Sequence, residues 1–301
     1  MSVQGGIHLK RLICAVLLLM MVLVGSACAE EIHEPFVWSG VKTKVVRSYE
    51  SDDLCFTIHR LMIKKRTTCY VTTIWMKEPG RQVKKAAAEW GKSLAAPSKL
   101  AKKVPEAAVV INGSGYINQT YPEIPETYPG TSEDYYNTSY GSLVITDGEI
   151  FRNLEDVPFY GVVLNAEGLR MYAGVLPEEI LQTNPISTWS FYDKCVLIDD
   201  YQDVLDREWD FAEHKATRTI LASIDRNNYV ILTATNNIGL RLSTATDFLM
   251  EHFHPQWAYN LDGGPSSDLF AWKKNSKKLR NFFGTDRKDF DVMCFCPLPQ
   301  E

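Results

Sequence analysis

A carboxylate, an amide and two hydroxyl groups occur together between Asn260 and Ser267, in the sequence NLDGGPSS. Asp262 provides a carboxylate, and two glycines directly after it allow a sharp turn and a close approach of the backbone to a ligand. The other polar groups of the segment belong to Asn260, Ser266 and Ser267. Composition alone also fits a tight turn in which Asp and Ser side chains cap backbone groups.

The segment resembles the signature of the phosphodiester glycosidase family, in which Asn-Leu-Asp-Gly-Gly-x-Ser-Ser follows a helix and a short strand. Weaker landmarks occur in the order typical of the family: Val110 to Gly113, Ser142 to Gly148, Thr217 to Thr219 and Thr244 to Phe253. The likeness extends from Ile111 to Cys294. It implies an enzyme that cuts a sugar from a phosphate at the anomeric carbon, in a GlcNAc-1-phosphate-type diester or a related phosphoglycan.

The implied reaction needs few catalytic groups. Glycoside cleavage passes through an oxocarbenium-like transition state, for which ordinary glycosidases use two carboxylates. Because phosphate is already a weak base, one carboxylate and a cation for the phosphate suffice. We predict that Asp262 acts at the anomeric centre and that Arg218 grips two phosphate oxygens with its planar guanidinium. The resemblance implies further substrate contacts at Asn112, Gly113, Thr219, Asn260, Gly263, Gly264, Ser266 and Ser267.

Each of these assignments has a structural alternative. Asp262 with neighbouring carbonyl groups would also suit a hard cation such as Ca²⁺. Arg218 would equally serve in a salt bridge, and Asn112 would hold a left-handed turn beside its glycine neighbour. No other cofactor is predicted, because the cysteines lack the spacing of a metal site.

Two departures from the family pattern favour a second function. Ser114 and Pro265 stand where the family usually has glycine. They are typical of a divergent branch with its own substrate, or of a homologue that has lost activity. The alternative prediction is therefore a catalytically inactive envelope protein that binds glycan or phosphoglycan on the same fold.

The elements that must position these residues are mostly short strands. Hairpins are predicted over residues 56–75 and 218–235, where β-branched and aromatic residues flank polar turns. Helices are predicted over residues 82–94 and, behind a capping box at Thr244, up to Phe253. This pattern predicts an α+β fold, with mixed, mostly antiparallel twisted sheets and a few packed helices in a single domain. Residues 120–140, rich in Tyr and Pro, predict a long loop that is either a sugar-stacking lid or a solvated excursion.

The N-terminus has the order of a secretory signal. Lys10 and Arg11 precede an apolar run, residues 12–24, and small residues follow it. We predict a signal peptide or membrane anchor over residues 1–29, an irregular leader over 30–53 and the glycosidase-like domain over 54–301. The protein is thus expected to be secreted or associated with the cell envelope. A lipid anchor on Cys28 is disfavoured, because Gly25 replaces the usual Leu of a lipobox.

Export would allow disulfides among the five cysteines that follow the signal segment. An odd number leaves at least one thiol unpaired within the chain. We predict a bridge between Cys55 and Cys69, and a second between Cys195 and either Cys294 or Cys296.

Length and charge limit the classes of partner. The 301 residues suit one large domain or two small ones. A formal net charge of −5 argues against a nucleic acid partner, which requires a concentrated basic surface. It does not argue against a sugar phosphate, because one well-placed arginine can bind a phosphate. Membrane contact is expected only through the N-terminal segment.

Overall fold

The computed structural model describes residues 41–117, 138–235 and 238–299, which belong to one compact unit. The predicted signal segment, with Cys28, lies outside the described residues, as does the tyrosine-rich loop up to residue 137. Within the described ranges, no helix is both long enough and apolar enough to cross a membrane.

The largest sheet has eight strands, and its pairings are antiparallel. In spatial order these are β1 (Thr43–Glu50), β2 (Leu54–Ile63), β3 (Thr67–Met76), β16 (Asn228–Ala234), β15 (Arg218–Ser223), β17 (Trp257–Asn260), β13 (Val196–Asp199) and β14 (Gln202–Asp203). Both predicted hairpins are confirmed here as β2–β3 and β15–β16. In β2, buried residues alternate with more exposed ones, as expected for a sheet with one face on the core.

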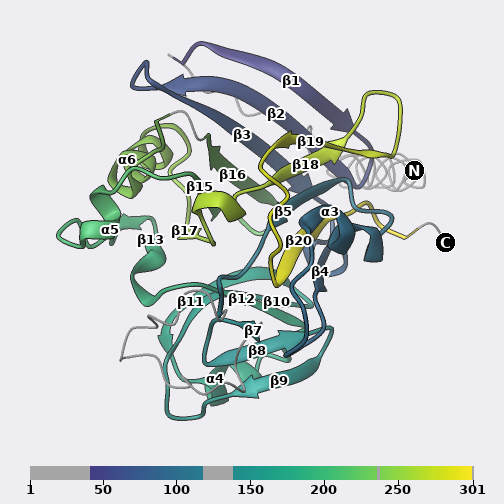
Figure 1. Cartoon of the computed structure of the whole chain (residues 1–301), viewed down its shortest axis with the longest axis vertical. Helices are drawn as coiled ribbons and strands as arrows, with labels where there is room; N and C mark the ends of the chain where they lie inside the picture. The colour runs from purple at the N-terminus through teal and green to yellow at the C-terminus, as the bar shows by residue number, and fades with distance from the viewer. Residues whose placement is uncertain (1–40, 118–137, 236–237, 300–301) are drawn as a thin grey trace, which may run out of the picture. The chain divides into compact units, whose positions relative to one another are not determined.

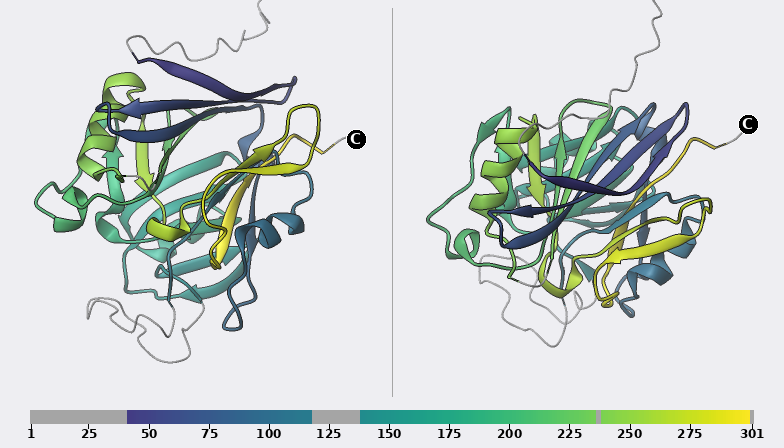
Figure 2. Two further views of the ribbon diagram at one scale, coloured as in Figure 1. Left: turned by 45° about the horizontal axis from the view of Figure 1, so that its top comes forward. Right: turned by 90° about the horizontal axis from the view of Figure 1, so that it is seen from above.

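A second sheet, of five strands, holds several residues of the site. Its spatial order is β19 (Leu279–Phe283), β18 (Leu269–Trp272), β5 (Val109–Asn112), β20 (Asp291–Phe295) and β4 (Val83–Ala87). The first strand of the domain meets this sheet, because Arg47 Nε in β1 donates to the Trp272 carbonyl of β18 at 2.7 Å. The views in Figures 1 and 2 show β1, in purple, beside the yellow β18–β19 hairpin.

Smaller sheets lie in the middle of the chain, in teal in Figure 1. They are a three-stranded sheet of β11 (Gly168–Val175), β10 (Phe159–Asn165) and β12 (Ser187–Ser190), and the pairs β6 (Tyr116–Ile117) with β7 (Thr138–Ser139) and β8 (Leu143–Thr146) with β9 (Glu149–Asn153). The helical elements are short except for the last α-helix. They are α2 (Pro79–Gln82), α3 (Pro97–Leu100), α4 (Pro177–Leu181), α5 (Asp210–Glu213), α6 (Leu242–His252), and the 3₁₀ turns η1 (Ala101–Lys103), η3 (Asp193–Cys195) and η4 (Gly264–Ser266).

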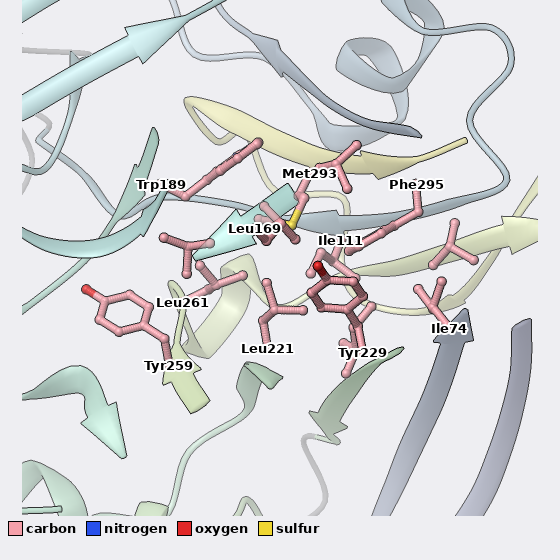
Figure 3. Packing of buried hydrophobic residues seen from close by; sticks show 14 of the residues in the cluster. Ile74, Ile111, Leu169, Trp189, Leu221, Tyr229, Tyr259, Leu261, Met293 and Phe295 are labelled. Atoms are coloured by element: carbon pink, nitrogen blue, oxygen red, sulfur yellow. The ribbon is translucent and has the colours of Figure 1, made fainter. Parts of the chain in front are cut away.

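One hydrophobic cluster joins the three larger sheets. Leu221 and Tyr229 come from the eight-stranded sheet, Ile111 and Met293 from the five-stranded sheet, and Trp189 from β12; all five are fully buried. Figure 3 shows these side chains directed towards one another. Because β5, β15 and β17 all contribute to this cluster, the core fixes the strands whose ends carry the predicted site. The predicted α+β class is confirmed by this mostly antiparallel arrangement.

The predicted helix over residues 82–94 is wrong. Helix α2 stops at Gln82, and the next five residues form β4, which pairs with β20 from Val83 opposite Phe295 to Ala87 opposite Asp291. Alanine and lysine are good helix formers, but intrinsic propensity is a weak influence, and pairing with a buried strand overrides it here. Lys85, in the middle of β4, is only 3% exposed.

Two element boundaries also differ from expectation. The predicted irregular leader contains β1, which pairs with β2 over most of its length, so the leader interpretation is wrong for these residues. Helix α6 begins at Leu242 with Arg241 at its N-cap and has no side-chain cap, so the capping box at Thr244 is also wrong. Thr244 instead lies within the first turn, where its hydroxyl accepts a bond from Lys64 Nζ at 3.4 Å.

Both predicted disulfides are wrong, since all five cysteines of the described region are free. In the β2–β3 ladder Cys55 lies opposite Trp75, whereas Cys69 lies opposite Leu61 near the other end. Cys195 packs in the cluster around Trp189, and a different cluster contains the remaining cysteines, Cys294 and Cys296. Strand register and packing therefore separate the predicted partners.

Candidate active site

The ends of three strands bring the predicted residues together. Asn112 is the last residue of β5, Arg218 is the first residue of β15, and Asp262 follows β17 by two positions. The Asp262 amide donates to the Gly113 carbonyl at 3.2 Å, and Asn112 Nδ2 donates to the Asp262 carbonyl at 2.8 Å. Segments that lie 150 positions apart in the chain are thereby joined at one point.

The Asn112 side chain is used within the protein. Its Oδ1 accepts from Thr219 Oγ1 at 2.7 Å and from the Asp268 amide at 3.1 Å, and the residue is 1% exposed. Because its amide and carbonyl groups both have protein partners, this geometry favours a positioning role for Asn112 and Thr219 over substrate contact. The alternative that Asn112 holds a left-handed turn is wrong, because it lies in a β-strand.

Asp262 is a buried carboxylate with a small opening to solvent, its side chain being 12% exposed. Its Oδ1 accepts from the Gly263 amide at 2.8 Å. Burial raises the pKa of the Asp262 carboxyl to about 6, against the opposing effects of the Ser266 hydroxyl and the Arg287 guanidinium. A carboxylate tuned to this range and held beside an opening is a candidate for catalysis.

The two glycines after Asp262 shape the loop. Gly264 has φ of +60°, which favours glycine, and its amide donates to the Thr217 carbonyl at 3.0 Å. A Cβ atom on Gly263 would lie 2.9 Å from that same carbonyl. The glycines thus let the loop pack against the segment before Arg218 and beside the Arg218 side chain, whose Cδ would lie 4.0 Å from the same Cβ atom.

Two further residues of the motif are buried with a polar atom left unpaired by the described residues. They are Asn260, through Oδ1, and Ser267, through Oγ. Asn260 Nδ2 donates a hydrogen bond to the Leu261 carbonyl at 2.9 Å, which leaves only Oδ1 unpaired. Burying an unpaired polar atom is costly, so these oxygens are available for further hydrogen bonding within the site.

Arg218 is fully buried and held by backbone carbonyl groups. Nη2 donates to Phe211 at 2.9 Å and to His214 at 2.8 Å, and Nε donates to Leu240 at 3.3 Å. Its guanidinium carbon lies 4.2 Å from the centre of the Phe211 ring. Burial lowers the pKa of Arg218 to about 10. The predicted alternative of a salt bridge is wrong for the described residues, which provide no carboxylate partner, and Nη1 has no partner among them.

Aromatic rings extend from Arg218 towards Asp262. Phe211 lies 4.7 Å from Trp209 and 6.3 Å from Tyr192, and Tyr192 lies 5.5 Å from Tyr140, measured between ring centroids. Burial raises the pKa of Tyr140 and Tyr192, and the nearby Asp262 carboxylate adds to both shifts. Half-buried aromatic rings beside a carboxylate offer apolar faces on which a sugar ring can stack.

A group of charged residues at the end of the chain was missed by the sequence analysis. Arg287 Nη2 donates to Ser266 Oγ at 2.6 Å and lies 4.0 Å from Asp262 Oδ2. Its Nε lies 3.9 Å from Asp289 Oδ1. The sequence Asp286-Arg287-Lys288-Asp289 reads as an exposed charged loop, and nothing in its spacing points to the Asp262 motif.

Two of the nearby carboxyl groups are buried without full hydrogen bonding. Asp289 is 1% exposed, and neither of its oxygens has a hydrogen-bond partner among the described residues. Burial, together with the charges of Asp262 and Asp268, raises the pKa of Asp289 to about 9. Burial also raises the pKa of Asp268 to about 7. Near neutral pH, Asp289 therefore retains its proton while Asp262 is largely ionised.

A buried ion pair forms the floor of the site. Lys85 Nζ lies 3.0 Å from Asp291 Oδ2, and both side chains are fully buried. Asp291 Oδ1 accepts from the Ser114 amide at 2.7 Å, and its Oδ2 accepts from Ser114 Oγ at 2.9 Å. The serine at a position where glycine is usual thus stabilises this carboxylate. A Cβ on Gly113 would lie 2.0 Å from Asp291 Oδ1, so the preceding glycine is required.

The geometry gives little support for a cation at Asp262. No group of three or more His, Cys, Asp or Glu side chains in the described ranges is arranged to hold a metal ion. The guanidinium of Arg287 already provides positive charge 4.0 Å from the Asp262 carboxylate. The Ca²⁺ alternative, which needs six or more oxygen ligands and would include carbonyl groups, stays a prediction.

A family model described as phosphodiester glycosidase matches residues 105–295. No curated protein sequence matches the chain. The catalytic domain of zebrafish N-acetylglucosamine-1-phosphodiester α-N-acetylglucosaminidase, auto-inhibited by its pro-peptide, is 15% identical with a TM-score of 0.59; the match covers 90% of this chain and 86% of that one. A hypothetical protein from Synechocystis is 15% identical with a TM-score of 0.51, over 85% of this chain and 64% of that one.

Proposed function

Because the chain belongs to the phosphodiester glycosidase family, we propose that it hydrolyses a sugar-1-phosphodiester bond, of the GlcNAc-1-phosphate type or in a related phosphoglycan. The main support is the buried carboxylate of Asp262, which lies beside aromatic rings and positive charge. On one side of the cleaved bond the sugar can stack on the aromatic rings, and on the other side the phosphate can bind the positive charge. The similar zebrafish enzyme, named for a GlcNAc-1-phosphodiester, suggests the sugar class.

In this proposal Asp262 acts on the sugar side of the bond. Its carboxylate faces the anomeric carbon and stabilises the positive charge that develops there as the bond to the phosphate oxygen breaks. The electron pair of that bond leaves with the phosphate, which needs no proton at neutral pH. Water then adds to the anomeric carbon and gives up a proton, which yields the free sugar and a phosphomonoester.

The remaining groups bind and orient. Tyr192, Trp209 and Phe211 offer ring faces to the sugar, while the unpaired oxygens of Asn260 and Ser267 accept from its hydroxyl groups. Arg218 supplies a buried positive charge with one NH₂ group free of protein partners. We also propose that the protein is exported, since its first 29 residues have the order of a secretory signal.

The test is hydrolysis of UDP-GlcNAc and of a GlcNAc-1-phospho-sugar by the purified full-length protein, compared with Asp262→Asn. The isosteric amide keeps the loop packed but cannot carry the negative charge. We expect release of GlcNAc by the native protein and a loss of at least about 1000-fold in the variant, on the order of 4 kcal/mol of transition-state stabilisation. Equal rates for the two proteins would refute the role of Asp262.

The alternative is a phosphoglycan-binding protein without catalysis. It is favoured by the limited opening at Asp262, whose side chain is only 12% exposed. Binding of a GlcNAc-1-phospho-sugar with no turnover, in a folded protein, would support this alternative. Failure to bind or to cleave either substrate would contradict both functions.

A further inference from the structure

Two arginines belong to this site, and their surroundings differ. Arg218 is fully buried, and its Nε and Nη2 donate to three backbone carbonyl groups. Moving its guanidinium towards a ligand would take a hydrogen-bond donor away from each of those buried carbonyl groups, which is costly. Arg218 is therefore well suited to fix the segments before β15 and α6, with only Nη1 left to bind anything else.

Arg287 has the opposite character. Its side chain is 35% exposed and lies over the Tyr116 ring, with its guanidinium carbon 5.3 Å from the ring centroid. Its one close hydrogen bond within the described residues is to Ser266 Oγ, and its Nε has no hydrogen-bond partner there. Nε is buried, but the hydrogens of its two NH₂ groups other than the one donated to Ser266 are available to a ligand.

The two carboxyl groups beside Arg287, those of Asp262 and Asp289, lie too far from it for close hydrogen bonds. Its nitrogen atoms lie 4.0 Å from Asp262 Oδ2 and 3.9 Å from Asp289 Oδ1. A paired arginine and carboxylate normally lie about 2.7–2.9 Å apart. Arg287 is thus held between two carboxyl groups without a full hydrogen bond to either, and its position leaves room for the oxygens of an entering anion.

Resting on the function proposed above, the geometry points to Arg287 as the residue that binds the phosphate group of the substrate, with Arg218 as a positioning residue. In the proposed reaction the anomeric carbon faces the Asp262 carboxylate. The Arg287 guanidinium, 4.0 Å from Asp262 Oδ2, then lies close to the phosphate on the other side of the cleaved bond. Phosphate oxygens next to the cleaved bond fall within reach of the free donors of Arg287. The guanidinium then also stabilises the charge that builds up on the leaving phosphate.

The local charge is compatible with an anion. Near neutral pH Asp289 keeps its proton, because its pKa is raised to about 9 by burial and by Asp262 and Asp268. Asp291 is balanced by Lys85 at 3.0 Å. The positive charge of Arg287 is therefore opposed by Asp262 and in part by Asp268, whose pKa burial raises to about 7. A phosphodiester thus meets a guanidinium that is not paired with two full negative charges.

The test compares two substrates of one sugar, UDP-GlcNAc and the uncharged 4-nitrophenyl N-acetyl-α-glucosaminide, in full-length Arg287→Ala and Arg287→Lys. We expect Arg287→Ala to lower kcat/KM for UDP-GlcNAc by about 100- to 1000-fold while the aryl glycoside changes less than about tenfold, and Arg287→Lys to recover part of the loss. The matched control removes another arginine nearby in the chain. Arg280 is exposed and lies in β19, the strand before Arg287, and Arg280→Ala should have the kcat/KM of the native protein on both substrates.

A second readout separates this inference from the proposed function. Binding of inorganic phosphate, followed by the rise in melting temperature, needs no turnover. We expect phosphate to stabilise the native and Arg280→Ala proteins but not Arg287→Ala. Native protein that binds phosphate but releases no sugar would contradict the enzyme and leave Arg287 supported. Unchanged phosphate binding in Arg287→Ala, absent binding by the native protein, or equal losses on both substrates would overturn the inference.

Discussion

The properties of Asp262 come from its surroundings more than from its residue type. Two residues past a buried strand, it is removed from water by the loop that Gly264 turns back onto Thr217. Burial then raises the pKa of its carboxyl to about 6. The same desolvation strengthens its interaction with any positive charge that develops in the site.

This pKa sets a pH dependence for the proposed activity. Asp262 must be ionised to stabilise an oxocarbenium ion, so kcat/KM for UDP-GlcNAc should rise about tenfold per pH unit below about 6 and level off above it. The measurement is a pH–rate profile between pH 4.5 and 8 on protein shown to remain folded. A flat profile over this range would exclude Asp262 as the group whose ionisation controls the reaction.

Asp289 leads to a prediction about stability. Its pKa is raised to about 9 in the folded protein from an ordinary value of 3.8. The folded state therefore holds a proton that the unfolded state has lost, and stability falls as pH rises from about 4 to 9. Asp289→Asn imitates the protonated form, and should be more stable than the native protein by at least about 1 kcal/mol at pH 9.

Chemical denaturation of the two proteins at several pH values measures this effect. The difference in unfolding free energy should be smallest near pH 4 and should grow with pH. Parallel stability curves for the native protein and Asp289→Asn would contradict the assigned ionisation.

At the scale of elements, β4 shows how a charged pair is built into the second sheet. Its alternation places Lys85 in the interior, where Nζ meets Asp291 of β20 and also donates to the Thr188 carbonyl at 2.6 Å. The neighbouring Lys84 points the other way and pairs with Glu106 at the surface. One strand therefore carries a buried and an exposed ion pair on successive residues, which makes a matched comparison.

Lys85→Met should destabilise the protein by about 3–5 kcal/mol, because it leaves Asp291 buried without its cation. Lys84→Met removes a partly exposed pair and should cost less than about 1 kcal/mol. The double variant Lys85→Met with Asp291→Asn should recover part of the loss, since no charge is then buried alone. Denaturant titration of the three variants checks the order, and equal effects of the two lysine substitutions would contradict the burial of Lys85.

The sequence predicted correctly those features whose pattern lies within one short stretch of the chain. The β15–β16 hairpin was predictable because two β-branched runs flank a polar turn, and the Asp262 segment because its residue types are unusual together. The helix expected at residues 82–94 failed because Ala and Lys fit a helix locally, whereas the partner strand β20 lies more than 200 residues away. Arg287 and Asp289 were missed for the same reason, since only folding brings them to Asp262.

At the scale of the whole molecule, the site lies where elements from all parts of the described chain meet. The β5 end provides Asn112, the β15 start provides Arg218, and the segment before β20 provides Arg287. The hydrophobic cluster beneath these ends joins the larger sheets and leaves the strands little freedom to move (Figure 3). Packing of distant segments, without cross-links among the described cysteines, therefore maintains the geometry that the proposed chemistry requires.

The absence of disulfides in the described ranges gives a prediction for the whole fold. Burial raises the pKa of Cys69, Cys195 and Cys296 to about 12, and raises that of Cys294 as well, so these thiols are poor nucleophiles. Cys55 is only half-buried and should be the first of the five to react. Reductant should leave the melting temperature unchanged, because no bond among these five cysteines is available to break.

Alkylation of the oxidised, full-length protein before and after denaturation, with mass spectrometry of the peptides, tests this prediction residue by residue. We expect Cys55 to be labelled in the native state and the four buried cysteines to be labelled only after unfolding, without reductant. Cys14 and Cys28 are scored separately, since they lie outside the described residues. Any of the five that required reductant for labelling would be disulfide-bonded, and if Cys195 and Cys294 both required it, the packing that separates them would be wrong. If all five react after unfolding alone, the fold owes its stability to burial, even if the protein is exported to an oxidising compartment.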